Sequence, residues 1–158
     1  MATTSIAHDA ACIFCKIIKG EIPSFKIIET PLTYSFLDIQ PISQGHILII
    51  PKYHGARLHN IPDEYLADIL PVVKKLTKVL DLDQYDKLSD IGYNVLQNNG
   101  SIAHQVVEHV HFHLIPKKDE ETGLIVGWPA EATDFDKLGK YHKQLQDQIQ
   151  SLKDSGKL

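Results

Sequence analysis

The chain has 158 residues, a formal net charge of −4 and a hydrophobic content of 43%, which together favour one domain around one core. A charged fraction of 23% is ordinary for a folded protein and excludes a disordered chain. The mild negative charge argues against non-specific nucleic-acid binding, and no apolar stretch approaches the roughly 20 residues of a membrane span. The unusual figure is nine histidines, most of them between residues 46 and 113.

The N-terminal segment, residues 1–11, has neither the basic nor the apolar region of a secretion signal. We expect a flexible arm there, a single domain over residues 12–158, and a protein that is not secreted. Cys12 and Cys15 form a C-x-x-C pair, and in a reducing compartment a structural disulfide between them is disfavoured. A redox pair would follow a buried strand, but here only a polar arm precedes it. Half of a zinc site and a pair of free buried thiols both fit.

The predicted helices are a short one over residues 13–19, one over 62–80 and a last one from about Asp134, behind a capping box at Thr133–Asp136. Pro71 falls inside the second helix and is expected to kink or restart it. Five apolar or alternating segments predict strands, at residues 25–29, 33–38, 46–50, 92–98 and 106–116. Strands grouped between two main helices indicate an α+β fold with an antiparallel sheet of about five strands.

The segment from His109 to Ile115 carries the most specific pattern, because alternation along a strand puts His109, His111 and His113 on one face. Neighbouring histidines on that face lie about 6.6–6.8 Å apart at Cα, and the outer two about 13 Å apart. Zinc–nitrogen bonds measure about 2.0–2.1 Å, so one ion does not readily bind the whole row. We therefore expect the three imidazoles to have different tasks.

One division gives His109 to the two cysteines, with a histidine just after the central strand as the fourth ligand. The resulting structural zinc site comprises Cys12, Cys15, His54 and His109. His59 competes with His54 for the fourth position. His111 and His113 are then left for chemistry, one as a neutral imidazole that attacks phosphorus and the other as a protonated imidazole that neutralises phosphate charge. Backbone amides of the loop around Gly100 would also bind the anion.

The run from His109 to Ile115 resembles the signature of the histidine-triad (HIT) family, in which three histidines alternate with apolar residues. The similarity extends from Cys12 to Lys117, about two-thirds of the chain. The C-x-x-C pair, the loop at 97–100 and the segment 127–129 are similar to the Hint branch of that family.

This resemblance implies a homodimer whose sheets join across the interface. It implies hydrolysis of adenosine 5′-monophosphoramidates to AMP and an amine, through a covalent adenylyl group on His111. It further implies a bound zinc ion, AMP and purine nucleotide phosphoramidates as ligands, neither a nucleic-acid nor a membrane partner, and a cytoplasmic and nuclear location.

Several roles follow from the resemblance residue by residue. The residues near the nucleotide would be Asp38 and Ile39 at the ribose and base, and Asn98, Gln105, His111 and His113 at the phosphate. His46 would support the triad as a third histidine of the catalytic group, and the zinc ligands would be the four named above. Many relatives have Ser or Thr after this glutamine, whereas Val106 has no hydroxyl to donate, so we expect an altered rate or leaving-group preference. His104 stands beside the phosphate positions with its role left open.

Three other functions compete with phosphoramidate hydrolysis. The first is hydrolysis of dinucleoside polyphosphates, for which Gln105 alone is thin support. The second is a non-catalytic purine-nucleotide-binding module that uses zinc for stability. The third is a zinc hydrolase with the metal at the reacting centre, which predicts that chelation stops turnover before it unfolds the protein.

Overall fold

The structure is a computed structural model that describes residues 7–84 and 91–158. The chain forms two units, Met1–Ile125 and Val126–Leu158, and each is described by itself. The first contains an antiparallel sheet in the order β1-β2-β3-β5-β4. Its strands are β1 (Lys26–Glu29), β2 (Thr33–Leu37), β3 (Ile47–Pro51), β4 (Gly92–Gln97) and β5 (Phe112–Lys117). The helices of the chain are α1 (Ile13–Ile18), α2 (Asp63–Val79) and α3 (Phe135–Asp154), with short 3-10 turns η1 (Leu58–Asn60) and η2 (Ser101–Ala103). The predicted α+β class is confirmed.

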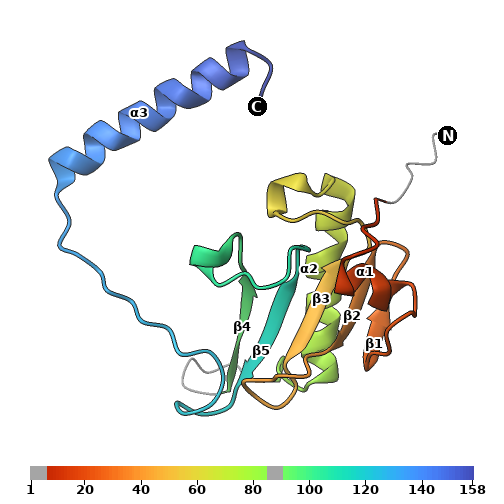
Figure 1. The fold of residues 1–158 in the computed structure, drawn as a ribbon. Helices are drawn as coiled ribbons and strands as arrows, with labels where there is room; N and C mark the ends of the chain where they lie inside the picture. Colours follow the sequence, from red (N-terminus) through yellow and green to blue (C-terminus); the bar gives the residue numbers. More distant parts are fainter. Residues whose placement is uncertain (1–6, 85–90) are drawn as a thin grey trace. The chain divides into compact units, whose positions relative to one another are not determined.

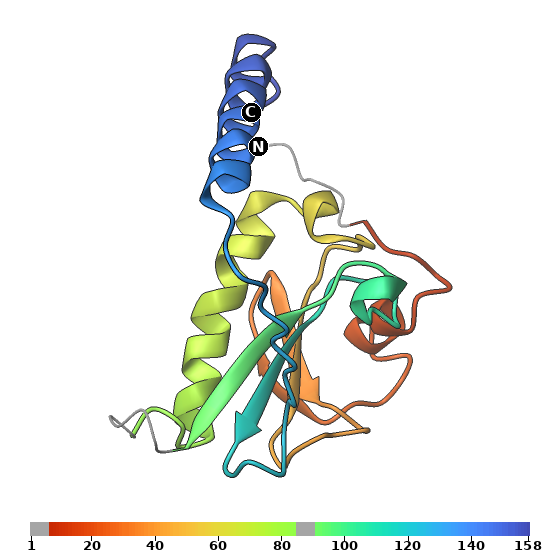
Figure 2. The same ribbon diagram turned by 90° about the vertical axis from the view of Figure 1, so that its left-hand side faces the viewer.

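The sheet is covered on both faces, α2 lying on one and α1 on the other (Figures 1 and 2). Alternation along β3 produces this arrangement, because Ile47 and Ile49 pack with α2 while Leu48 and Ile50 pack with α1. β3 is therefore apolar on both sides, which explains its uninterrupted apolar sequence. It pairs with β5 through Leu48 opposite His113, so the histidine segment lies at the centre of the sheet.

Helix α2 continues through Pro71, so of the two predicted outcomes the restart does not occur, and the kink stays a prediction. Proline lacks the amide hydrogen that would bond to the carbonyl of Ala67 one turn earlier. Both residues lie on the exposed face of α2, where water can satisfy that carbonyl. The opposite face, with Ile69, Val73 and Leu76, packs on the sheet and keeps the helix in place.

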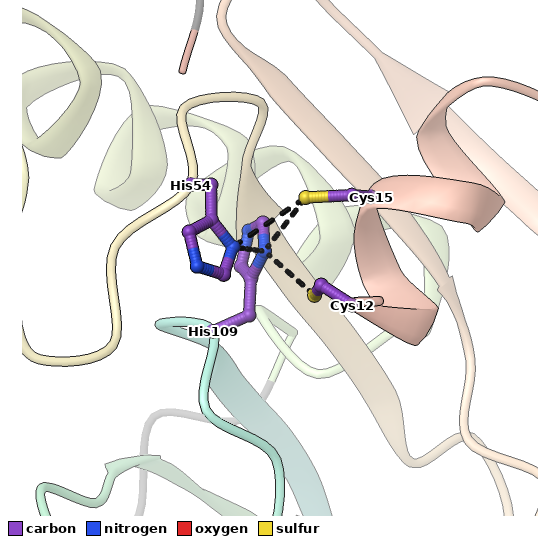
Figure 3. Close-up of side chains that lie close together, drawn as sticks. All are labelled: Cys12, Cys15, His54 and His109. Atoms are coloured by element: carbon purple, nitrogen blue, oxygen red, sulfur yellow. Dashed lines mark hydrogen bonds between the residues drawn. The ribbon is translucent and has the colours of Figure 1, made fainter. Parts of the chain in front are cut away.

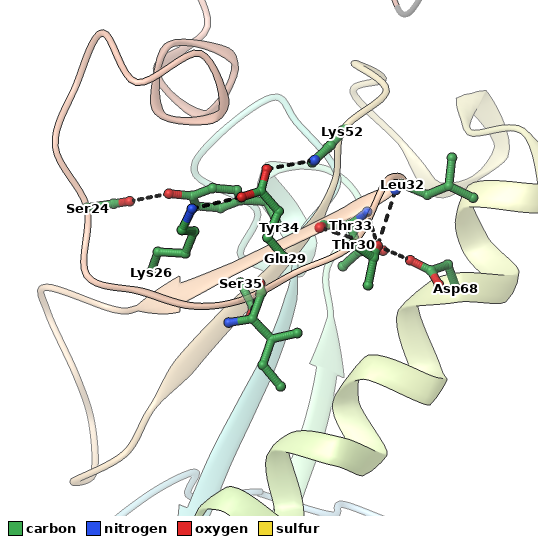
Figure 4. Close-up of polar contacts among 11 residues, drawn as sticks. Ser24, Lys26, Glu29, Thr30, Leu32, Thr33, Tyr34, Ser35, Lys52 and Asp68 are labelled. Atoms are coloured by element: carbon green, nitrogen blue, oxygen red, sulfur yellow. Dashed lines mark hydrogen bonds and ion pairs between the residues drawn. The ribbon is translucent and has the colours of Figure 1, made fainter.

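Polar contacts fix the turn between β1 and β2 (Figure 4). The Thr30 hydroxyl accepts from the amide of Thr33 at 2.8 Å and donates to the Asp68 carboxylate of α2 at 2.5 Å. On the neighbouring surface, Glu29 pairs with Lys52 at 2.7 Å and with a lysine of its own strand. The hairpin is thus tied to α2 through Asp68, while β2 pairs with β3 from Thr33 opposite Pro51 to Leu37 opposite Ile47.

The last strand of the sheet is shorter than the sequence predicts, since β5 begins at Phe112 and not near residue 106. Pairing with β3 stops at Ile49 opposite Phe112, and the preceding residues bond elsewhere. The amide of Val110 donates to the carbonyl of Gly55 at 2.8 Å. His109 and His111 therefore lie on a bent, irregular segment before β5, which frees them to face two different sites.

The second unit consists of a connecting segment and α3, whose N-cap is Asp134. Its carboxylate accepts from the amide of Lys137 at 3.0 Å, so the N-cap is Asp134 and not Thr133, the first residue of the predicted capping box, whereas the predicted helix start near residue 134 is confirmed. Part of the expected flexible arm, residues 1–6, lies outside the described residues. In the described part of this arm, residues 7–11, the Ala7 carbonyl accepts a hydrogen bond from the amide of His54 at 2.8 Å. Within the described ranges, no helix has the length and apolar character to cross a membrane.

Candidate active site

Two cysteines and two histidines meet between α1 and the segments that follow β3 and precede β5 (Figure 3). Cys12 caps the start of α1 and Cys15 lies one turn later, so the helix presents both thiols on one side. His54 follows β3, and His109 comes from the irregular segment before β5. The four residues predicted for zinc are thus brought together, while His59 is exposed on η1 and is not part of the cluster.

The distances within this cluster match a tetrahedral metal site. Cys12 Sγ and Cys15 Sγ lie 3.5 and 3.7 Å from His109 Nδ1, Cys15 Sγ lies 3.5 Å from His54 Nδ1, and the two Nδ1 atoms are 3.3 Å apart. Tetrahedral zinc bonds of about 2.0–2.1 Å to nitrogen and about 2.3 Å to sulfur require separations of about 3.3 Å between nitrogens and about 3.5 Å between nitrogen and sulfur. These residues therefore fit Zn²⁺.

The protonation of this cluster also fits a cation. His109 Nε2 lies 2.9 Å from the carbonyl of Pro51, so Nε2 carries the hydrogen and Nδ1 turns its lone pair toward the thiols. Burial lowers the pKa of His109 to about 4, which keeps this ring neutral. Burial also raises the pKa of the Cys15 thiol, so its thiolate needs a nearby positive charge of the kind a metal supplies.

A cavity of about 600 Å³ opens beside the cluster, between α1, the β2–β3 loop and the loop after β4. One part is apolar and is lined by Phe14, Ile17, Ile22 and Leu48. The other part is polar and is lined by Asp38, His46, Asn98, His104, His111 and His113. The size and the mixed lining suit a small ligand with one flat apolar group and one anionic group.

His111 is buried at the polar end, and its tautomer can be assigned. Its Nδ1 lies 2.6 Å from the backbone carbonyl of His109, and because a carbonyl only accepts, Nδ1 is the protonated nitrogen. Nε2 then holds the free lone pair. Burial lowers the pKa of His111, so the ring stays neutral and nucleophilic at physiological pH. Phe14 packs edge-on against it with ring centroids 5.3 Å apart.

A chain of hydrogen bonds fixes the next two imidazoles. The amide of Ile42 donates to His46 Nδ1 at 3.4 Å, so His46 is protonated at Nε2 and donates to His113 Nδ1 at 2.9 Å. His113 is therefore protonated at Nε2, the nitrogen left for a ligand. Burial, assisted by the neighbouring imidazoles, lowers the pKa of His113 to about 4. His113 thus acts as a neutral hydrogen-bond donor.

Asp38, His46 and His113 also cluster closely, but their geometry suits a proton and not a metal. The 2.9 Å between His46 Nε2 and His113 Nδ1 is a direct hydrogen bond and is shorter than the nitrogen separation of about 3.3 Å in a tetrahedral zinc site. Asp38 Oδ2 lies 3.5 Å from the same His46 nitrogen. The carboxylate also accepts from the amide of Gln40 at 2.8 Å, which orients it at the end of β2.

The loop after β4 is held against the segment after His54. Gln105 Nε2 donates to the carbonyls of Ala56 and Val107 at 2.6 and 2.9 Å, and Gln105 Oε1 accepts from the amide of Gly100 at 2.7 Å. Gly100 has a φ of +90°, and a Cβ there would collide with the Arg57 guanidinium. Gln105 thus braces the loop with its entire amide, and its predicted contact with phosphate stays a prediction.

The remaining residues predicted for the nucleotide all line the cavity, namely Asp38, Ile39, Asn98, His111 and His113, and so does His46. Sequence reasoning missed its apolar wall, including Phe14 and Ile17, although the apolar face of the short first helix carried a signal. It also missed Arg57, whose guanidinium lies beside the loop after β4. No local pattern marks that residue.

Residues 19–120 match the family model described as HIT domain. The chain belongs to the histidine-triad family. This HIT protein is 76% identical over 144 residues to adenosine 5′-monophosphoramidase HNT1 of Candida albicans, covering 91% of this chain and 95% of that one. It is 69% identical over 137 residues to the Saccharomyces cerevisiae protein of the same name, covering 87% and 82%.

Among solved structures, the HIT protein is similar to a histidine triad nucleotide-binding protein from Candida albicans, with a TM-score of 0.88 and 75% identity. That match covers 90% of this chain and 99% of the other. The likeness therefore extends beyond the residues of the family model.

Proposed function

We propose that the protein hydrolyses adenosine 5′-monophosphoramidates to AMP and an amine through an adenylyl group on His111. The observation that carries this function is the pair of opposite tautomers at the polar end of the cavity. His111 offers a lone pair at Nε2, whereas His113 offers a hydrogen at Nε2. A nucleophile beside a neutral donor is what attack on a phosphorus atom requires. The high identity to proteins named adenosine 5′-monophosphoramidase supports the same reaction.

In the first step, the His111 Nε2 lone pair forms a bond to phosphorus and the bond from phosphorus to the amine nitrogen breaks. The amine leaves with that electron pair and takes up a proton. In the second step, water attacks phosphorus, loses a proton, and the electron pair of the phosphorus–imidazole bond returns to His111. His113 donates to a phosphate oxygen throughout, and the His109 carbonyl stabilises the positive charge that develops on His111.

The purine would occupy the apolar part of the cavity, against Phe14 and Ile17, with Ile39 at its exposed edge. Asp38 lines the polar part, where its carboxylate can accept from ribose hydroxyls. Asn98 lines the polar part and would donate to the phosphate.

The test is release of AMP from adenosine 5′-phosphoramidate and from AMP linked to the lysine side chain. We expect turnover by the purified protein, its loss in His111→Ala with the circular dichroism spectrum unchanged, and normal turnover in His59→Ala, the matched control. Mass spectrometry of the acid-sensitive intermediate should place the adenylyl group on His111. Full activity of His111→Ala would refute the proposal.

We further propose that Cys12, Cys15, His54 and His109 bind a structural zinc ion. The tetrahedral separations and the neutral, Nδ1-directed His109 support this. When bound, zinc joins α1 to the segments that follow β3 and precede β5. Metal analysis should find about one zinc ion per chain, lost in Cys12→Ser and retained in His59→Ala. Retention of zinc by Cys12→Ser would contradict this ligand set.

We propose a homodimer in which β4 pairs with its copy. β4 ends the sheet, and Tyr93 and Val95 on it are 45% and 42% exposed. An exposed apolar edge strand favours pairing with another chain. Light scattering should give the mass of two chains, and Val95→Lys should reduce it toward one. An unaltered mass in that variant, or a monomeric wild type, would contradict the proposal.

We also propose that the protein acts in the cytoplasm and nucleus and binds neither nucleic acid nor membranes. Support comes from the reduced cysteines of the metal cluster, which suit a reducing compartment, and from the net charge of −4. Imaging of a fluorescent fusion and filter binding with duplex DNA test these expectations.

A further inference from the structure

The reaction needs a proton for the leaving amine, and the hydrogen bonds of the cavity limit where it can come from. Four of the described histidines line the cavity: His46, His104, His111 and His113. The hydrogen of His111 is held by the His109 carbonyl, and that of His46 is held by His113. His113 has a hydrogen for the ligand, but a neutral imidazole is a poor acid.

His113 is poorly suited to carry a second proton, because it is packed among other imidazoles. Its ring centroid lies 5.0 Å from that of His111 and 5.1 Å from that of His46. Burial and these neighbours lower the pKa of His113 to about 4. These contacts disfavour a second proton on His113, so a basic amine needs a different donor.

His104 is the one of these four histidines that is exposed. It follows η2 with a φ of +65° and a ψ of 20°, a left-handed conformation that residues other than glycine rarely adopt. Its amide donates to the Ser101 carbonyl at 3.0 Å, and the amide of Gln105 next to it donates to the Gly100 carbonyl at 3.0 Å. These loop hydrogen bonds fix a left-handed backbone conformation at position 104, and the residue at that position is a histidine.

Val106, two residues after His104, cannot supply a proton in place of this imidazole. Val106 also lines the cavity and is 90% exposed, yet its side chain has nothing to donate. The neighbouring Gln105 braces the loop with its whole amide, and Asn98, which would donate to the phosphate, has no titratable proton to give to the amine. His104 is therefore the exposed imidazole of this part of the cavity wall, close to Val106 along the loop.

We propose that His104 is the general acid that protonates the leaving amine. This inference rests on the proposed function. As the phosphorus–nitrogen bond breaks, the imidazolium of His104 gives one proton to the amine nitrogen and becomes neutral. In the second step, the neutral imidazole takes one proton from the attacking water, so that the protonation state of His104 is restored. The net reaction consumes one phosphoramidate and one water and yields AMP and the amine.

The left-handed backbone makes a sharp test available, because glycine fits that conformation better than histidine does. His104→Gly removes the imidazole without straining the loop, and we expect its thermal stability to equal or exceed that of the wild type. Asp81→Gly is the matched control, since Asp81 has a φ of +55° and is the other non-glycine residue with positive φ among those described. This control should keep wild-type turnover.

The decisive measurement compares leaving groups of different basicity. An alkylamine such as the lysine side chain needs a proton to leave, whereas p-nitrophenolate on AMP does not. His104→Gly should lower kcat for the alkylamine substrate about 100-fold or more and leave the p-nitrophenyl ester within a few-fold of wild type. Adding Val106→Ser to His104→Gly should restore part of the lost rate, because it returns a donor beside the leaving group.

Two results would overturn the assignment: equal rate losses for both leaving groups in His104→Gly, which would indicate a structural role, or an unchanged rate with the alkylamine. Failure of the proposed function itself is distinguishable, because then the wild type would release no AMP from either substrate.

Discussion

The neutral state of His113 predicts a measurable loss of stability in acid. Burial lowers its pKa from 6.5 to about 4, so below the ordinary value the unfolded chain binds a proton that the folded protein does not. The free energy of unfolding therefore falls as the pH falls from about 6.5 to about 4, and His113 contributes no pH dependence outside that window. Each pKa unit is worth about 1.4 kcal/mol, so the loss is about 2 kcal/mol at pH 5 and about 3 kcal/mol in full.

The experiment is urea unfolding of the wild type and of His113→Asn, both with the same added zinc concentration, at about pH 7.5 and about pH 5. Asparagine can still accept from His46 but does not titrate. Other acid-sensitive groups, including His109, are shared by the two proteins and cancel in the comparison. We expect the wild type to lose about 2 kcal/mol more than the variant between the two pH values. Equal losses would refute the reasoning, because His113 would then be free to take up a proton in the folded state.

Three further predictions concern the metal, the loop and a helix. Chelation should lower the melting temperature and turnover together, measured by calorimetry and AMP release, and turnover that stops while the melting temperature holds would favour a metal at the reacting centre. Gln105→Ala should lower kcat about 10–100-fold by loosening the loop, with faster hydrogen exchange at the Gly100 amide, and slow exchange there would contradict the bracing role. Pro71→Ala, on the exposed face of α2, should raise the free energy of unfolding by about 1–3 kcal/mol in urea titrations, and a decrease would show that proline fits this position better than alanine.

The sequence predicts the sheet well where one residue pattern determines one structural outcome. The run from Ile47 to Ile50 is apolar throughout and forms the doubly covered central strand. The C-x-x-C spacing and the division of the histidine row likewise predict the Cys/His cluster. The apolar run acts over a few residues, whereas the cluster joins distant segments and was predictable because tetrahedral zinc chemistry restricts which side chains can complete the C-x-x-C pair.

The sequence fails where distant segments decide the outcome. Pairing of Val110 with Gly55 shortens the last strand, and no residue near Val110 reveals it. Packing of one face of α2 on the sheet outweighs the tendency of Pro71 to break the helix. The brace formed by Gln105 depends on carbonyls of Ala56 and Val107, so its side chain could not be separated from a ligand contact beforehand.

His109 connects the metal cluster to the chemistry through two different atoms. Its ring nitrogen Nδ1 faces the cysteines, and its backbone carbonyl accepts from His111 Nδ1 at 2.6 Å. A shift of the His109 backbone would move the carbonyl that fixes the His111 tautomer, and the opposite tautomer would turn a hydrogen toward phosphorus. If the proposed zinc ion is bound by this cluster, it would hold His109 in place and so help to keep the lone pair of His111 directed at the substrate.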